Sequence, residues 1–132
     1  MSRASPIVAI VDDDESVRRA VRRLVRSLGM DADTFGSGQD LLDLLEAMPS
    51  FRPDCVVLDV RMPGLNGLEI QQRLSGSGIP VIFITGHDDP GARERALAAG
   101  AVAVLRKPFG DEVLARALEA AMGQRRDPAA GR

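Results

Sequence analysis

The sequence has 132 residues, with 45% hydrophobic and 27% charged side chains, a balance typical of one soluble globular domain. Its net charge of −2 and its lack of Trp and Tyr argue against direct nucleic-acid binding, which favours basic surfaces and aromatic side chains that stack on bases. It has neither a signal-like apolar N-terminus nor a segment of membrane-spanning length, so we expect a cytoplasmic protein without a membrane partner.

Apolar residues divide the chain into alternating strand and helix patterns. Most of the apolar runs are nearly continuous, as expected of strands covered on both faces of a parallel sheet, whereas the second run is weaker. In chain order, the predicted strands are residues 7–11, 31–35, 55–58, 81–84 and 101–105. The predicted helices that follow them are residues 17–28, 39–48, 66–74, 90–100 and 113–122. This alternation predicts a doubly wound α/β domain.

Residue types that begin or end helices support these boundaries. They are Gly29, Pro49, Asn66, Pro90, Gly100 and Gly123. We expect residues 1–6 to be an N-terminal extension, residues 7–122 to be the folded domain, and residues 123–132 to be a flexible polar tail.

Polar side chains follow four of the predicted strands at their carboxyl ends, where open parallel sheets bind ligands. Three consecutive aspartates, residues 12–14, follow the first strand, Asp59 the third, Thr85 the fourth and Lys107 the fifth. Clustered carboxylates are suited to Mg²⁺, and an aspartate can be the nucleophile of phosphoryl transfer. A hydroxyl and an ammonium group can hold the oxygens of the transferred group. Lys107 is the only lysine among 17 basic residues, and its compact ammonium suits a tight phosphate site.

These features together resemble the response regulator receiver domain of two-component signalling in bacteria, over about residues 7–122. The matching segments are Ile-Val-Asp-Asp-Asp at 10–14, Leu-Asp-Val-Arg-Met-Pro-Gly at 58–64, Asn-Gly at 66–67, Ile-Thr-Gly at 84–86 and Lys-Pro-Phe at 107–109. The resemblance implies a flavodoxin-like (β/α)5 fold with strand order 2-1-3-4-5.

The resemblance also implies a metal site. Asp12 and Asp13 are the acidic pair, Asp13 as a direct ligand and Asp12 largely through water. Asp59 and the backbone carbonyl of Arg61 complete the protein ligands. The expected cofactor is Mg²⁺, with Mn²⁺ as an alternative.

For the phosphoryl group itself, the resemblance implies that Asp59 is the phosphoacceptor. Thr85 is then the switch hydroxyl, and Lys107 bonds the phosphoryl group. The resemblance further implies a cis peptide bond between Lys107 and Pro108, a form that costs little free energy before proline.

Other conspicuous residues have a structural interpretation. We expect Asp14 to be a helix N-cap rather than a metal ligand. Cys55, the only cysteine, fits a reducing compartment and is interpreted as a buried packing thiol. A run of arginines on the first predicted helix is interpreted as its solvated face. These are Arg18, Arg19, Arg22, Arg23 and Arg26.

The sequence departs from the family pattern at Val104, three residues before Lys107, where receivers usually have Tyr or Phe. Because valine is short and stiff, we hypothesise that the switch works through backbone shifts after Thr85 and in the fourth helix. Arg61 and His87 flank the site, and we expect them to affect the dephosphorylation rate more than the affinity for Mg²⁺.

Three alternatives remain. A pseudo-receiver would use the same fold as a phosphorylation-independent docking module, and only Val104 favours it. An aspartate-nucleophile phosphatase generally needs a general acid two residues after the nucleophile, where this chain has Arg61. A flavodoxin-type cofactor binder needs a phosphate-cradling loop after the first strand, where this chain has carboxylates.

We therefore predict a signalling switch, not an enzyme with an external substrate: a stand-alone receiver that catalyses only its own phosphorylation and dephosphorylation. Its expected partners are a histidine kinase or histidine phosphotransfer protein and an unidentified downstream protein. The expected interaction surface is formed by the fourth helix, fifth strand and fifth helix, which can also support a homodimer. The same sequence would also suit part of a longer regulator with a DNA-binding output domain.

Overall fold

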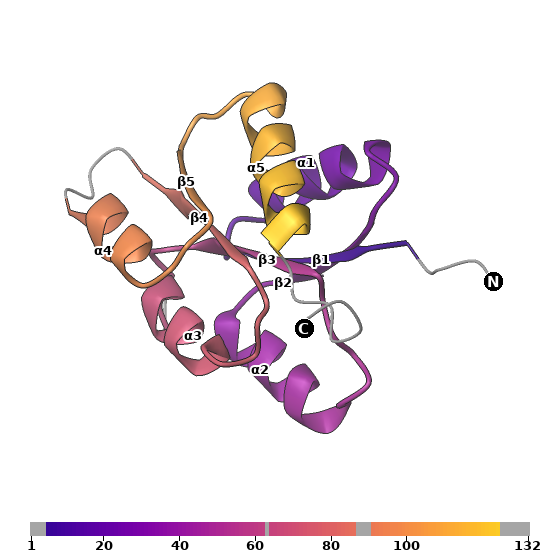
Figure 1. The fold of residues 1–132 in the computed structure, drawn as a ribbon, viewed down its shortest axis with the longest axis vertical. Coiled ribbons are helices and arrows are strands. Elements are labelled where there is room, and N and C mark those ends of the chain that lie inside the picture. Colours follow the sequence, from indigo (N-terminus) through magenta and orange to yellow (C-terminus); the bar gives the residue numbers. More distant parts are fainter. Residues whose placement is uncertain (1–4, 63, 87–90, 125–132) are drawn as a thin grey trace.

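The computed structural model of the chain describes residues 5–62, 64–86 and 91–124 (Figure 1). Within these ranges, parallel strands form one sheet in the order β2-β1-β3-β4-β5. The strands are β1 (Ile7–Val11), β2 (Asp31–Phe35), β3 (Cys55–Asp59), β4 (Val81–Thr85) and β5 (Ala103–Arg106). The helices are α1 (Glu15–Ser27), α2 (Gly38–Ala47), α3 (Gly67–Leu74), α4 (Ala92–Ala98) and α5 (Asp111–Gln124). The predicted flavodoxin-like (β/α)5 fold and its strand order are confirmed.

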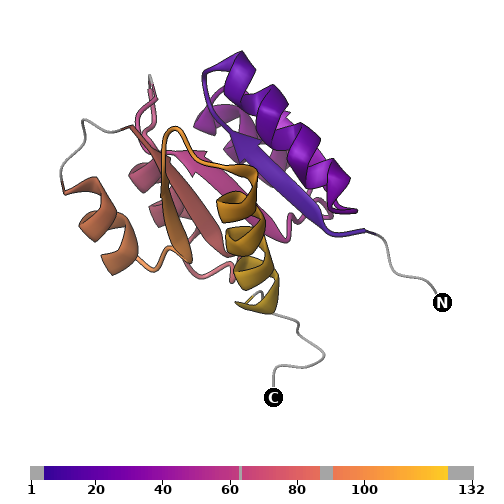
Figure 2. The same cartoon turned by 90° about the horizontal axis from the view of Figure 1, so that it is seen from above.

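Helices cover both faces of the sheet. α1 and α5 pack on one face and α2, α3 and α4 on the other (Figures 1 and 2). Because successive strand side chains point to opposite faces, each strand contributes to two cores. Val57 packs with α1 and α5, whereas its neighbour Val56 packs with α2, α3 and α4. Burial on both faces explains the continuous apolar runs, and Cys55 is fully buried, as predicted for a packing thiol.

The weaker second run is the edge strand β2. It pairs with β1 on one side, and its Asp31 and Asp33 side chains are exposed. An edge strand has less apolar surface to bury than a central one, so its sequence can contain more polar residues. The prediction of a strand at this position is nevertheless correct.

β5 begins two residues later than predicted. The backbone N–H groups of Gly100 and Ala101 donate to the carbonyls of Leu97 and Ala96, both at 3.0 Å, and so close the end of α4. The strand therefore starts at Ala103 rather than residue 101. The apolar run predicted the strand, but part of it completes the helix C-terminus.

The last two helices also differ at their ends. α5 continues through Gly123 to Gln124 instead of ending before Gly123. α4 begins at Ala92, and its predicted first residue, Pro90, lies outside the described residues. In the described part of the chain, no helix is long and apolar enough to cross a membrane.

Parallel pairing brings the strand ends to one edge of the sheet. β1 and β3 are in register so that the residues after their last pair, Asp12 and Asp59, lie side by side. β4 and β5 are in register so that Thr85 lies opposite the residue before Lys107. The fold thus collects the polar residues of four loops at the carboxyl edge.

Candidate functional site

Three carboxylates meet at the carboxyl edge of the sheet. Asp12, Asp13 and Asp59 each offer an oxygen, and these oxygens lie within 4.8 Å of one another. Asp12 and Asp59 are buried at the ends of β1 and β3, whereas Asp13 is exposed on the following loop. The cluster therefore has a closed side formed by the sheet and an open side toward solvent.

Asp12 is fully buried, with two differently placed carboxylate oxygens. Its Oδ1 accepts a hydrogen bond from the backbone N–H of Asp14 at 2.9 Å. Its Oδ2 receives no hydrogen bond and lies 3.4 Å from Lys107 Nζ. Burial raises the pKa of Asp12 to about 6, with a further rise from Asp59, while the Asp14 N–H and Lys107 act in the opposite direction.

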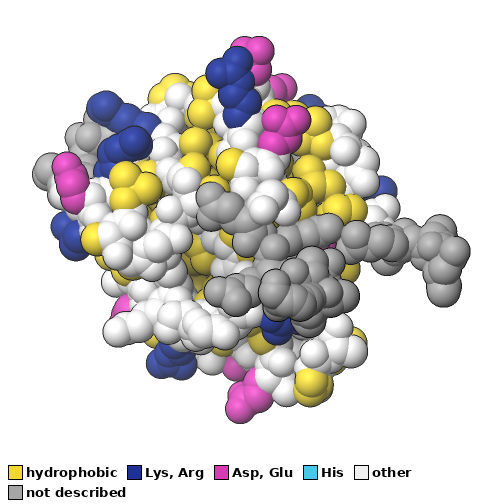
Figure 3. Space-filling model, in the orientation of Figure 1, with side chains coloured by type: hydrophobic (Ala, Val, Ile, Leu, Met, Phe, Trp, Pro, Cys, Tyr) yellow, Lys and Arg dark blue, Asp and Glu magenta, His cyan; other side chains and the backbone are white. Residues whose placement is uncertain are grey.

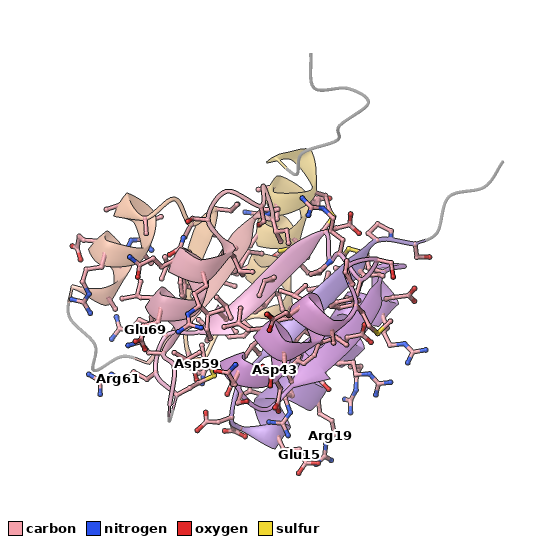
Figure 4. All side chains as sticks on the ribbon, turned by 90° about the horizontal axis from the view of Figure 1, so that it is seen from below. Glu15, Arg19, Asp43, Asp59, Arg61 and Glu69 are labelled. Atoms are coloured by element: carbon pink, nitrogen blue, oxygen red, sulfur yellow. The ribbon has the colours of Figure 1, made fainter. Side chains whose placement is uncertain are left out.

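Asp59 is held at the end of β3. Its Oδ1 accepts a hydrogen bond from the backbone N–H of Arg61 at 3.0 Å, and its Oδ2 lies 3.3 Å from Lys107 Nζ. The Arg61 side chain is exposed. In Figure 4 it lies on the same side of Asp59 as Glu69, at the outside of the molecule. Both Asp59 oxygens are thus oriented before any ligand binds.

Lys107 places its ammonium between Asp12 and Asp59. Its backbone N–H donates to the Thr85 carbonyl at 2.8 Å, and the bond to Pro108 is cis, as the resemblance implied. Burial alone would lower the pKa of Lys107, but the two nearby carboxylates outweigh it and the pKa is raised. The ammonium form therefore persists throughout the neutral pH range.

Thr85 is buried at the end of β4 and does not join the acidic cluster. Its backbone carbonyl accepts from Lys107, but among the described residues its hydroxyl makes no hydrogen bond to the acids. The structure therefore places Thr85 beside the site, without a side-chain hydrogen bond to Asp59 among the described residues.

Gly67, the first residue of α3, packs directly behind Asp59. A Cβ atom added at Gly67 would lie 2.5 Å from the Asp59 carbonyl oxygen and 2.8 Å from the Phe83 ring. Its N–H also donates to the Val60 carbonyl at 3.0 Å. The sequence match includes Gly67, but only the structure gives its reason: α3 approaches β3 too closely for a side chain.

One contact at the site contradicts the sequence interpretation. Arg19, Arg22, Arg23 and Arg26 are exposed as predicted, and Arg19 pairs with Glu15 at 3.3 Å on the surface (Figure 4). Arg18 instead is half-buried, and its Nη1 donates to the Asp12 backbone carbonyl at 2.7 Å. Helical periodicity could not separate Arg18 from its neighbours, because its partner is a backbone atom of a loop.

Three further residues singled out in the sequence are Asp14, Val104 and His87. Asp14 is confirmed as the N-cap of α1, because its side chain accepts from the Ser16 N–H at 2.9 Å. Val104 is buried on β5 in the same core as Ala92 and Ala96 of α4. His87 lies outside the described residues.

The donor set fits a hard divalent cation. Three carboxylates face one ammonium, so the cluster keeps an excess of negative charge, and the buried Asp12 Oδ2 has no hydrogen-bond donor. Mg²⁺ is typically bound by a few carboxylates, with water and phosphate oxygens completing its shell. Asp12, Asp13 and Asp59 can therefore hold such an ion on the open side of the cluster.

Comparisons with known proteins agree with this arrangement. The family model for the response regulator receiver domain matches residues 8–119. Nodulation protein W of Bradyrhizobium diazoefficiens is 46% identical over 117 residues, which cover 87% of this chain and 50% of that protein. Response regulator protein TodT of Pseudomonas putida is 40% identical over 124 residues, covering 92% of this chain and 53% of that protein. The chain spans about half the length of these curated relatives.

A solved structure agrees equally well. The response regulator receiver protein from Burkholderia phymatum superposes with a TM-score of 0.84 at 60% sequence identity, covering 93% of this chain and 98% of that one.

Proposed function

Because the chain belongs to the response regulator receiver family, we propose that Asp59 accepts a phosphoryl group from a histidine kinase or a histidine phosphotransfer protein. Such regulators are signalling proteins. The observation that carries the proposal is the position of the Asp59 carboxylate, which meets Lys107 Nζ at 3.3 Å and shares one cluster with Asp12 and Asp13.

In the proposed transfer, a carboxylate oxygen of Asp59 attacks the phosphorus atom of a phosphohistidine. An O–P bond forms as the P–N bond breaks, and the histidine leaves with the electron pair of that bond. The Arg61 N–H and Lys107 fix the plane of the Asp59 carboxylate before the donor arrives. Later attack by water at the phosphorus atom breaks the bond between Asp59 and the phosphoryl group, releases inorganic phosphate and restores the Asp59 carboxylate.

The metal ion would be held by Asp12, Asp13 and Asp59, with the backbone carbonyl of Arg61 as a further ligand. Mg²⁺, or Mn²⁺ in its place, supplies positive charge to the phosphoryl oxygens when bound. Support comes from the acidic donor set and from Asp12 Oδ2, which accepts no hydrogen bond among the described residues. Asp12, as the most buried acid, anchors the closed side of the site.

Lys107 and Thr85 are proposed to hold the phosphoryl group. The ammonium of Lys107 already contacts two carboxylates and needs little movement to meet a phosphoryl oxygen on Asp59. The Thr85 hydroxyl makes no bond to the acids in the described residues and is thus available as the switch group. Its movement would be transmitted along the chain toward α4.

The proposal excludes turnover of an external substrate: the domain catalyses only its own phosphorylation and dephosphorylation. The acids and the lysine of the site are all in place, so nothing in the described site favours a pseudo-receiver. Arg61 does not offer the acid that a phosphatase would need, and the acidic loop after β1 disfavours a flavin phosphate.

The donor protein is proposed to dock beside Lys107. A largely apolar groove of about 520 Å³ lies between α1 and α5 and ends at Lys107. Ala20 and Leu24 of α1 and Phe109 line it. A helix of the kinase or phosphotransfer protein placed there would bring its histidine to the open side of the acidic cluster.

The downstream target is proposed to bind the surface of α4, β5 and α5, which can also form a homodimer. Leu97 and Val113 are large apolar side chains exposed on its two helices. Basic side chains and an acidic one lie around α4 on this side of the molecule (Figure 3), and Arg93 and Arg95 are among the exposed residues of that helix. We propose a receiver unit that begins at residue 7 after an extension at 1–6, in a cytoplasmic protein. The proposed tail, expected at 123–132, follows the end of α5 at Gln124.

An intact-mass experiment tests the proposed function. The protein is incubated with Mg²⁺ and acetyl phosphate, beside Asp59→Asn and the control Asp14→Asn, which alters the exposed helix cap. We expect an increase of about 80 Da, one phosphoryl group, in the wild type and in Asp14→Asn but not in Asp59→Asn or without metal. An adduct that persists in Asp59→Asn would refute Asp59 as acceptor, and no adduct at all would favour the pseudo-receiver.

A further inference from the structure

Arg18 differs from the other arginines of α1. Its side chain is half-buried, whereas Arg19, Arg22, Arg23 and Arg26 are exposed. It lies on the first turns of the helix, where its own N–H donates to the Asp14 carbonyl at 3.0 Å. A cation that gives up part of its hydration next to an acidic cluster needs a specific partner.

That partner is the backbone carbonyl between the two acids. Arg18 Nη1 donates to the Asp12 carbonyl at 2.7 Å, a short charge-assisted hydrogen bond. The peptide unit that contains this carbonyl joins Asp12 directly to Asp13. Arg18 therefore fixes the orientation of the link between both acids.

The rest of Asp12 is held independently. Its N–H donates to the Phe35 carbonyl at 3.2 Å, and its Oδ1 accepts from the Asp14 N–H at 2.9 Å. Asp13 has no such support, since among the described residues its exposed carboxylate receives no hydrogen bond. The direction of the Asp13 side chain thus depends on the peptide unit that Arg18 holds.

The guanidinium group is itself anchored between two loops. Gly36, in the connection from β2 to α2, lies alongside it, so that a Cβ atom there would be 3.6 Å from Arg18 Nη1. The head group therefore lies next to both the β1–α1 loop and the β2–α2 loop. This placement limits its freedom to leave the Asp12 carbonyl.

We propose that Arg18 is a positioning residue, which holds the Asp12–Asp13 peptide unit so that both carboxylates face the same divalent cation. The inference rests on the proposed function, because it assumes that these acids bind Mg²⁺. It assigns Arg18 a part in metal binding although its charge has the same sign as the ion.

That sign makes the inference testable. If Arg18 acted only through its charge, its removal would strengthen Mg²⁺ binding, because two cations repel each other. If Arg18 acts through the hydrogen bond, its removal weakens Mg²⁺ binding by about tenfold, at the lower end for outer partners of metal ligands. The two roles therefore predict opposite changes in the dissociation constant.

The test is a Mg²⁺ titration of the metal-free protein, followed by backbone amide chemical shifts, since the chain has no Trp or Tyr to serve as a fluorescent probe. Arg18→Met keeps the apolar stem and removes the charge and donor. Arg22→Met removes the same charge from an exposed position of the same helix. Arg18→Lys restores a charged donor of similar reach.

We expect weaker binding in Arg18→Met, unchanged or slightly tighter binding in Arg22→Met, and affinity near the wild type in Arg18→Lys. Because the shifts report on folded molecules, a purely structural role would lower the melting temperature without changing this affinity. Arg18→Met matching Arg22→Met would overturn the inference and leave the proposed function intact. A wild type without saturable Mg²⁺ shifts would overturn the proposed metal site and, with it, this inference.

Discussion

α3 and α4 pack on the same face of the sheet, and each follows a strand that ends at the site, yet they are fixed very differently. α3 begins with a capping box, in which Asn66 and Glu69 exchange hydrogen bonds at 2.9 Å. The N-cap residue of α4 is Gly91, which has a left-handed conformation and provides no side-chain cap. α3 buries Ile70 and Leu74 in the core, whereas α4 buries only alanines among its described residues.

The difference between the two helices matches the different roles proposed for the two sides of the site. α3 supports β3 and Asp59, the proposed phosphoacceptor, whose chemistry needs a fixed geometry. α4 follows β4 and Thr85, the proposed switch residue, and a switch needs an element with a small free-energy difference between two arrangements. The acid side is therefore preorganised, and the α4 side is the part that can respond.

The largest predicted effect comes from breaking the contact between α3 and β3. Gly67→Ala would place a methyl group 2.5 Å from the Asp59 carbonyl oxygen. We expect a loss of about 2–3 kcal/mol in the free energy of unfolding, measured by denaturant titration, and strongly reduced phosphorylation of Asp59. Gly123→Ala is the control: nothing lies within 4 Å of its Cβ position, and it should stabilise α5 slightly.

A smaller effect concerns the buried acid. The pKa of Asp12 is raised from 3.8 to about 6 in the metal-free folded protein. Between these two pH values, Asp12 is protonated in the folded protein and ionised in the unfolded chain. Stability linked to Asp12 is present below pH 3.8 and is lost as the pH rises through about 6.

Asp12→Asn should therefore stabilise the metal-free protein at pH 7.5 by about 2 kcal/mol and have little effect below pH 4. Thermal unfolding across this pH range, without and with Mg²⁺, measures the difference. Saturating Mg²⁺ should reverse it, because the wild type gains more from binding the ion than the variant, which has lost one of the three carboxylates. A variant that is less stable than the wild type without metal at pH 7.5 would contradict the assigned cause.

Removing the cap of α3 should lower its local stability toward that of α4. Asn66→Ala removes one half of the capping box, and we expect a loss of about 1 kcal/mol in stability. In hydrogen exchange, wild-type α3 amides should be better protected than α4 amides, and the variant should narrow this gap. Ser75→Ala, at the other end of α3, removes an exposed hydrogen bond to Gln72 and should change little.

The smallest predicted effect is the response of α4 itself. With beryllofluoride as the phosphoryl mimic, we expect amide shifts to extend from Asp59 to residues 92–100, although Val104 has no large ring to move. Val104 shares its core with Ala92 and Ala96 of α4, and its backbone carbonyl accepts a hydrogen bond from Arg93 Nη1 of that helix at 3.3 Å. Shifts confined to the surroundings of Asp59 would contradict a switch based on backbone movement of this segment.

The sequence was a good guide to the sheet and the acids because both depend on local patterns. Continuous apolar runs predicted the central strands, and polar residues directly after them predicted Asp12, Asp59 and Lys107 at one edge. The start of β5 was missed because part of its apolar run closes α4. Periodicity alone could not show that two neighbouring residues of a run belong to different elements.

The supporting contacts of the site could not be read in the same way. Arg18 looked like one of several equivalent arginines, since its distinction is a hydrogen bond to a backbone carbonyl of another segment. The steric reason for Gly67 depends on how closely α3 approaches β3, which is a tertiary property. Residue types predicted what the site can bind, whereas its rigidity became visible only from the packing.

The two separate cores of the molecule have a consequence for its evolution. The groove proposed for the donor belongs to the face of α1 and α5, whereas α4 rests on the core of the opposite face. Substitutions that adapt α1 to a new donor protein therefore need not disturb the packing of α4, and α4 can diverge toward a new target in the same way. The same chemistry at the sheet edge can thus be kept while the surfaces for the donor and for the target change independently.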